Sequence, residues 1–105
     1  MVTTDDGLIA AIEFQEHGEK QWLCAGFVDL QVNGYAGHDL NGLTLDIATV
    51  RALCQAMLKV GVTTFLPTII TAPEARISAA LKAILEACAQ YPEVAAMVAG
   101  IHVEG

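Results

Sequence analysis

From Gly26 to Gly105 the chain alternates three apolar runs with two amphipathic stretches, and this order limits the possible folds more than any other feature. The apolar runs, at 26–32, 63–70 and 98–103, have the length of strands. The stretches between them repeat apolar residues at helical spacing. Strands that alternate with helices are typical of a parallel sheet with crossover connections. The pattern therefore predicts an α/β fold with three parallel strands and two helices.

Local signals place the ends of both predicted helices. The first is expected at 45–60, with Thr44 as N-cap and Gly61 in the left-handed position after its last turn. The second follows 71–74 (Thr-Ala-Pro-Glu), which matches a capping box, and it ends at Tyr91 because a residue before proline disfavours the helical region. The predicted apolar stripes are Ile47, Val50, Cys54, Met57 and Leu58, then Ile77, Ala80, Leu81, Ile84, Leu85 and Cys88.

The first twenty residues follow a different pattern. Short apolar alternation at 8–14 predicts one or two short antiparallel strands, and residues 16–20 are expected to form a turn.

Composition excludes several classes of protein. A net charge of −7 with only five basic residues argues against nucleic-acid binding, which depends on Lys and Arg at phosphates. No apolar run approaches the ~18 residues of a membrane span, and no secretory signal is present at the N-terminus, so a cytoplasmic location is expected. A hydrophobic fraction of 54% in 105 residues is what a buried piece of a larger protein would show. The cysteines have no metal-type spacing, and Cys54 and Cys88 are interpreted as small buried hydrophobes in a reducing compartment.

Polar residues end the first and third predicted strands. Because residues i and i+2 of a strand face the same way, Asp29, Gln31 and Asn33 are expected on one face, and His102 and Glu104 on one face of the later strand. Amides are poor zinc ligands but good partners for a metal-bound water, whereas a carboxylate suits a divalent cation. The structural alternatives are that the amides cap an open strand end, that the histidine is packed in the core, and that the glutamate is simply exposed. If these side chains form a functional site at the strand ends, Asp29 could instead lie below it and bond backbone groups. His38 could border the entrance of that site.

Three motifs carry a family resemblance. Residues 26–34 fit G-F-[IV]-D-x-Q-x-N-G, residues 61–71 fit G-x-T-x-[FY]-L-P-T-x-I-T, and residues 100–105 fit G-[IL]-H-x-E-G. In this order they resemble the N-acetylglucosamine-6-phosphate deacetylase family of the amidohydrolase superfamily, over about 6–105. The resemblance implies that the chain is the N-terminal piece of a longer metal-dependent (β/α)₈ TIM barrel. Residues 1–24 would belong to a small β-sandwich, and 25–105 would be the first β/α units of the barrel.

The resemblance also implies roles for the polar residues. Glu104 matches a metal ligand, and Gln31 and Asn33 stand where much of the superfamily has His-x-His, so they would order water or substrate, with His102 near the same cavity. One divalent metal ion, zinc, is implied for each site, with an amino-sugar phosphate as substrate and a homo-oligomer as the full-length protein. The family's remaining metal histidines and catalytic aspartate match nothing here. No catalytic residue is therefore assigned, and the chain alone is expected to be inactive.

Two other interpretations stay open. Another amidohydrolase, dihydroorotase-like or a deaminase, would usually retain His-x-His, so Gln31 and Asn33 count against it. A truncated, non-catalytic α/β module that acts only by association is the other alternative.

Overall fold

The computed structural model describes residues 1–14, 16, 18 and 23–105. Its main sheet has the order β3-β6-β7, built from β3 (Phe27–Val32), β6 (Val62–Ile69) and β7 (His102–Val103). Both pairings are parallel, which confirms the predicted α/β architecture with three parallel strands. The third strand is shorter than predicted. Its first part is reduced to an isolated parallel bridge between Val98 and Phe65, and regular pairing resumes only at His102.

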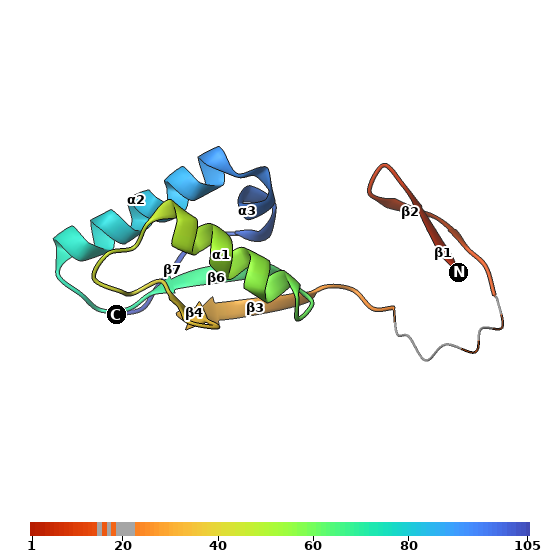
Figure 1. Ribbon diagram of the computed structural model, residues 1–105, viewed down its shortest axis with the longest axis horizontal. Coiled ribbons are helices and arrows are strands. Elements are labelled where there is room, and N and C mark those ends of the chain that lie inside the picture. The colour runs from red at the N-terminus through yellow and green to blue at the C-terminus, as the bar shows by residue number, and fades with distance from the viewer. Residues whose placement is uncertain (15, 17, 19–22) are drawn as a thin grey trace.

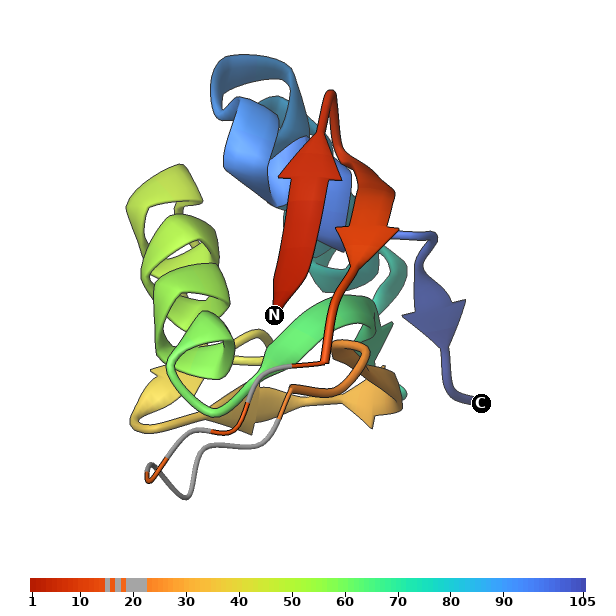
Figure 2. The same ribbon diagram turned by 90° about the vertical axis from the view of Figure 1, so that its right-hand side faces the viewer.

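The helices α1 (Ile47–Leu58), α2 (Glu74–Gln90) and α3 (Pro92–Met97) lie on one face of this sheet (Figures 1 and 2). The first two confirm the predicted crossovers, and α2 ends before Tyr91 as expected. The third was not predicted. Pro92 stops α2 but suits the first turn of a new helix, because its fixed φ is helical and its missing N–H would be unpaired there in any case.

Both predicted N-caps are wrong. Helix α1 is capped by Asp46, whose Oδ1 accepts a 2.7 Å hydrogen bond from the Thr49 backbone N–H, so Thr44 lies outside the helix. The N-cap position of α2 is Pro73, which makes no side-chain capping bond. The Thr71 hydroxyl donates to the carbonyl of Glu104 instead, because Thr71 comes two residues after the end of β6 and lies beside the end of β7.

The core lies between the helices and the sheet. Most of the predicted stripe residues contribute to it, but Leu58 and Leu85 are 44% and 61% exposed, because each lies at the outer border of its stripe. The largest buried apolar side chains are Leu40, Val50, Leu53, Cys54, Met57, Phe65, Ile69, Ile84, Val94 and Met97. Within the described part of the chain, no helix has the length and apolar character needed to cross a bilayer.

Two small hairpins complete the structure. β1 (Val2–Asp5) and β2 (Leu8–Ile12) pair antiparallel, as the N-terminal alternation predicted. β4 (Gly34–Tyr35) and β5 (His38–Asp39) form an unpredicted hairpin directly after β3. Its two turn residues, at 36 and 37, have φ values of 51° and 87°, as in the turns that suit two-residue hairpins. The predicted turn at 16–20 lies largely outside the described residues, and so does His17.

Candidate functional site at the carboxyl ends of β3 and β7

An extra residue interrupts β3 next to its predicted site residues. Asp29 pairs with Phe65 and Val32 with Pro67, so three steps along β3 match two steps along β6. Such a bulge reverses the alternation of side chains. Asp29 and Val32 therefore share the face of the buried Phe65 and Pro67, and Gln31 lies on the opposite face. The prediction that Asp29 shares a face with Gln31 is wrong for this reason.

Side chains replace the ladder hydrogen bonds that the bulge removes. The Gln31 backbone N–H donates to Oδ1 of Asp29 at 3.1 Å, and the Val32 N–H donates to Oγ1 of Thr68 at 3.1 Å. Thr68 is fully buried, and its hydroxyl donates in turn to the carbonyl of Leu66 at 3.2 Å. Asp29 thus bonds backbone beneath the site, as its structural interpretation predicted.

The bulged strand brings Gln31 to Glu104. The side-chain Nε2 of Gln31 donates to Oε2 of Glu104 at 3.3 Å, although the two residues come from opposite ends of the α/β part. The Glu104 main chain is held on both sides: its N–H donates to the Ile69 carbonyl at 2.8 Å, and its carbonyl accepts the Thr71 hydroxyl at 3.2 Å. The side chains of Gln31 and Glu104 are both exposed.

The other predicted site residues lie nearby without side-chain partners. His102 is half-buried and pairs with Thr68 in the ladder, so it shares a face with Glu104, two residues later. Asn33 is half-buried, and its main-chain carbonyl accepts the Leu40 N–H at 3.0 Å. Neither the His102 imidazole nor the Asn33 amide makes a side-chain hydrogen bond to any described residue.

Comparisons with known proteins find relatives that cover most of this chain. The chain is 41% identical over 83 residues to the N-acetylglucosamine-6-phosphate deacetylase of Haemophilus influenzae, which covers 79% of this chain and 21% of that protein. It is 38% identical over 104 residues to the N-acetylgalactosamine-6-phosphate deacetylase of Escherichia coli O157:H7, covering 95% of this chain and 27% of that protein.

A solved structure gives the same result. The crystal structure of N-acetylglucosamine-6-phosphate deacetylase from Pasteurella multocida matches 77% of this chain and 20% of its own chain, with a TM-score of 0.67 and 37% identity. The chain is therefore a relative of the amino-sugar 6-phosphate deacetylases. It spans about a fifth to a quarter of the length of these relatives. No family model matches the chain.

For a relative of these deacetylases, the fit of the site to a metal ion depends on its donor atoms. The Glu104 carboxylate is exposed at the sheet edge, and Gln31 bonds one of its two oxygens, so it retains lone pairs for a cation. No three His, Cys, Asp or Glu side chains in 1–14, 16, 18 and 23–105 come together in a geometry that could hold a metal. The described residues thus suit a divalent cation as the source of one carboxylate ligand, whereas a catalytic zinc site usually has three protein ligands.

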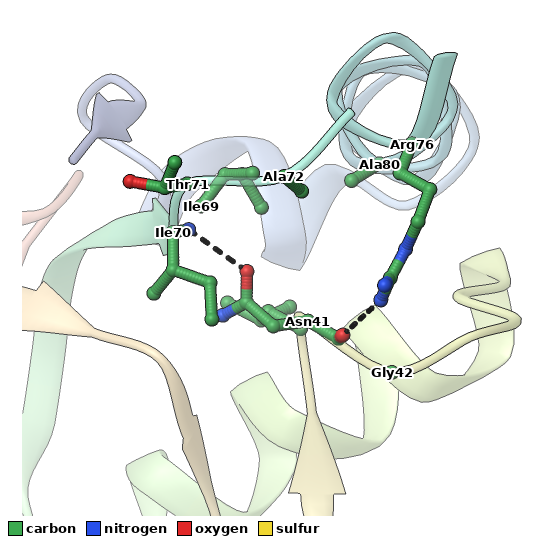
Figure 3. A pocket seen from close by; sticks show the side chains of 9 residues that line it. Asn41, Gly42, Ile69, Ile70, Thr71, Ala72, Arg76 and Ala80 are labelled. Carbon is green, nitrogen blue, oxygen red and sulfur yellow. Dashed lines mark hydrogen bonds between the residues drawn. The ribbon is translucent and has the colours of Figure 1, made fainter. Parts of the chain in front are cut away.

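Sequence reasoning missed one residue near the deacetylase-like motifs. Asn41, which follows the β4–β5 hairpin, lines a cavity of about 50 Å³ beside the carboxyl end of β6 (Figure 3). Its side chain accepts from the Ile70 N–H, and its main-chain carbonyl accepts from Arg76 Nη2 at 2.9 Å. Its only sequence signal was the Asp39-Leu-Asn pattern of an Asx turn, in which Asp39 Oδ1 accepts the Asn41 N–H at 2.8 Å.

Proposed function

We propose that this chain forms part of a deacetylase that hydrolyses N-acetylglucosamine 6-phosphate to glucosamine 6-phosphate and acetate. The Gln31–Glu104 contact carries the proposal, because it joins two of the three motifs at the carboxyl edge of a parallel sheet. That edge is where α/β barrels carry their chemistry. Support also comes from the Haemophilus influenzae and Pasteurella multocida relatives, whose names state this activity.

The proposal includes the larger fold. Residues 25–105 would be the first three strands and two crossover helices of a (β/α)₈ barrel, and 1–24 would be strands of a small β-sandwich. The parallel order β3-β6-β7 supports this, as does the helical cover on one face only. On the uncovered face, Val28 and Leu30 are 63% and 67% exposed, as apolar residues that would line the interior of a closed barrel.

In this scheme Glu104 is one ligand of a single divalent metal ion, zinc. Gln31, Asn33 and His102 line the water and substrate side of the same cavity. When bound, such a metal supplies Lewis acidity and lowers the pKa of a water molecule. The neutral amide of Gln31 orients the Glu104 carboxylate by a hydrogen bond. Because the amide carries no charge, it does not neutralise the negative charge of the carboxylate that would attract the metal. No residue of this chain is assigned as general acid or base, so the chain alone is expected to release no acetate. The whole enzyme is proposed to be cytoplasmic and homo-oligomeric.

A chimera tests the proposal. Residues 26–105 replace the matching segment of the Haemophilus influenzae deacetylase, and acetate release from N-acetylglucosamine 6-phosphate is measured together with bound metal. We expect activity in the chimera, and joint loss of metal and activity in its Glu104→Gln variant. Glu86→Gln, an exposed carboxylate on α2, is the control that should retain both. A chimera that binds metal but releases no acetate would overturn the proposal, as would full activity in Glu104→Gln.

The epimeric substrate is a second candidate, because the Escherichia coli relative that covers 95% of this chain is named for N-acetylgalactosamine 6-phosphate. The same chimera can be assayed with both sugars. A higher kcat/KM for the galactosamine compound would assign the segment to that substrate.

A further inference from the structure

The carboxyl end of β3 is no longer paired with β6 at the point where the proposed site begins, although the Asn33 carbonyl accepts the Leu40 N–H of the following hairpin. Pairing between β3 and β6 ends at Val32 with Pro67, and the preceding step contains the bulge. Asn33 therefore follows the last ladder pair. A strand end that carries site residues needs another source of rigidity, because misplacement by about 1 Å is enough to impair a site.

The side chain of Asn41 supplies that support. Its Nδ2 donates to the Thr68 carbonyl at 3.0 Å and, in a longer bond, to the Asn33 carbonyl at 3.4 Å. Its Oδ1 accepts the Ile70 N–H at 3.0 Å (Figure 3). One half-buried amide thus joins the end of β3 to two residues at the end of β6.

The chemistry of these partners requires an amide. Asn41 gives the Thr68 carbonyl a donor, gives the Asn33 carbonyl a second donor beside the Leu40 N–H, and gives the Ile70 N–H an acceptor. A primary amide offers two donor hydrogens and a carbonyl oxygen on one planar group. The partners also fix which atom of Asn41 is nitrogen, since the opposite orientation would place its oxygen against the Thr68 and Asn33 carbonyls. An aspartate of the same shape would keep the bond from Ile70 and lose both donated bonds.

The same stretch of β6 anchors the strand that carries Glu104. Thr68 and Ile69 pair with His102 and Val103, and the Glu104 N–H donates to the Ile69 carbonyl at 2.8 Å. Asn41 therefore links Asn33 to the end of β6, and the same end of β6 binds the main chain of Glu104. Gln31 lies two residues before Asn33, so this bridge acts close to the contact between Gln31 and Glu104.

We propose that Asn41 is a positioning residue of the deacetylase site, which sets the end of β3 at the distance at which Gln31 contacts Glu104. The inference rests on the proposed function for its biological meaning, but the geometry it predicts can be measured without sugar or metal. A failure of the chimera assay would leave that geometry untouched, and a failure of the geometry would leave the assay result standing. The two are therefore distinguishable.

The test is solution NMR on the ¹⁵N,¹³C-labelled 105-residue chain, in a buffer with arginine and glutamate that suppresses the self-association expected at the open edge of β3. The signal is the nuclear Overhauser contact between the side-chain amide protons of Gln31 and the side-chain protons of Glu104. We expect this contact in the unsubstituted chain and its loss in Asn41→Asp, with core methyl shifts around Leu53 unchanged. The control for stability is Arg51→Ala, which removes a 2.8 Å ion pair to Glu93 on the helical side. This control should lower Tm and keep the contact.

Persistence of the contact in Asn41→Asp would overturn the proposal, and so would its absence from the unsubstituted chain. If Asn41→Asp does not fold, because its carboxylate would face two carbonyl oxygens, Asn41→Ala decides in its place. Loss of the contact with an intact core would then support the proposal. Retention of the contact in Asn41→Ala would show that Asn41 does not set the site geometry, and unfolding of the whole α/β part would show that it holds the fold rather than the site. Either outcome would overturn the proposal.

Discussion

The amide of Gln31 donates to the carboxylate of Glu104 across 3.3 Å, and the strands that position the two residues do not pair with each other. β6 lies between β3 and β7, so the contact spans the middle strand at the carboxyl edge of the sheet. The bulge in β3 makes it possible, because it turns Gln31 to the face opposite Asp29. The two motif residues are therefore brought together by an irregularity in the ladder rather than by strand alternation alone.

A second carboxylate at position 31 should make stability depend on pH. Gln31→Glu would replace the hydrogen bond to Glu104 by two neighbouring carboxylates, and such neighbours disfavour the ionisation of both groups at once. The variant should be less stable than the unsubstituted chain at neutral pH and should recover in mild acid, where one carboxyl takes up a proton. Urea unfolding at both pH values measures this. Gln55→Glu, on the exposed side of α1, is the matched control and should show no such recovery. Equal pH dependence in both variants would contradict the prediction.

The buried hydroxyl of Thr68 should contribute measurably to the free energy of unfolding. Thr68→Val keeps the shape but removes the acceptor of the Val32 N–H beside the bulge. A buried backbone donor left without a partner costs about 1–3 kcal/mol, so the free energy of unfolding should fall by that amount. Thr68→Ser retains the hydroxyl and loses only a methyl group, which makes it the comparison. A valine variant as stable as the unsubstituted chain, in denaturant unfolding, would show that water satisfies Val32.

The three cysteines should react in the order of their exposure. Burial raises the pKa of the Cys54 thiol to about 11 and also raises the pKa of Cys88, whereas Cys24 is exposed. A thiol reagent at neutral pH should therefore label Cys24 first and Cys54 only on unfolding, because the thiolate is the nucleophile. Mass spectrometry over time gives the order. Early labelling of Cys54 in the folded chain would contradict it.

The same burial predicts a loss of stability in alkali. The pKa of Cys54 is about 11 in the folded chain, above the ordinary value of 9.0. Burial of its thiol therefore contributes fully to the free energy of unfolding below pH 9, and this contribution declines as the pH rises toward 11. Replacing Cys54 by Ala should remove this part of the pH dependence, and Cys24→Ala should leave it unchanged. Thermal unfolding across that pH range measures the difference.

The alternation of apolar runs and amphipathic stretches was sufficient to predict the parallel sheet and both crossover helices. These elements follow from periodicity, which depends only on which face each residue buries. The caps were assigned wrongly for a local reason: several hydroxyl and carboxyl residues precede each helix, and the choice between Thr44 and Asp46 is made by the backbone path. Helix α3 was missed because Pro92 was interpreted only as a stop signal.

The candidate site was predictable as a set of residues but not as an arrangement. Strict alternation correctly placed His102 and Glu104 on one face of their strand. It placed Asp29 on the wrong face, since no local sequence signal marked the bulge in β3. Asn41 could not be found, because its role depends on carbonyl groups that only the folded strand ends bring within reach. Long-range backbone geometry is the information that the sequence pattern lacks.

The exposed face of β3 should drive self-association. β3 is an edge strand, and Val28 and Leu30 on its uncovered face are 63% and 67% exposed. An edge with unpaired backbone groups and adjacent apolar side chains is a template for pairing with another strand. We expect the 105-residue chain to form oligomers at micromolar concentration, as measured by sedimentation or light scattering.

A charge at the centre of that surface should reverse the effect. Leu30→Lys places a lysine on the strand edge, where natural proteins often use one to block pairing, so the weight-average mass should fall toward that of a monomer. Leu85→Lys is the matched control, because Leu85 is similarly exposed, at 61%, but lies on α2 with no free strand edge. Its mass should match that of the unsubstituted chain. If the unsubstituted chain is a monodisperse monomer that unfolds cooperatively, its open sheet face is stable in water. That result would count against the proposal that these strands are part of a larger barrel.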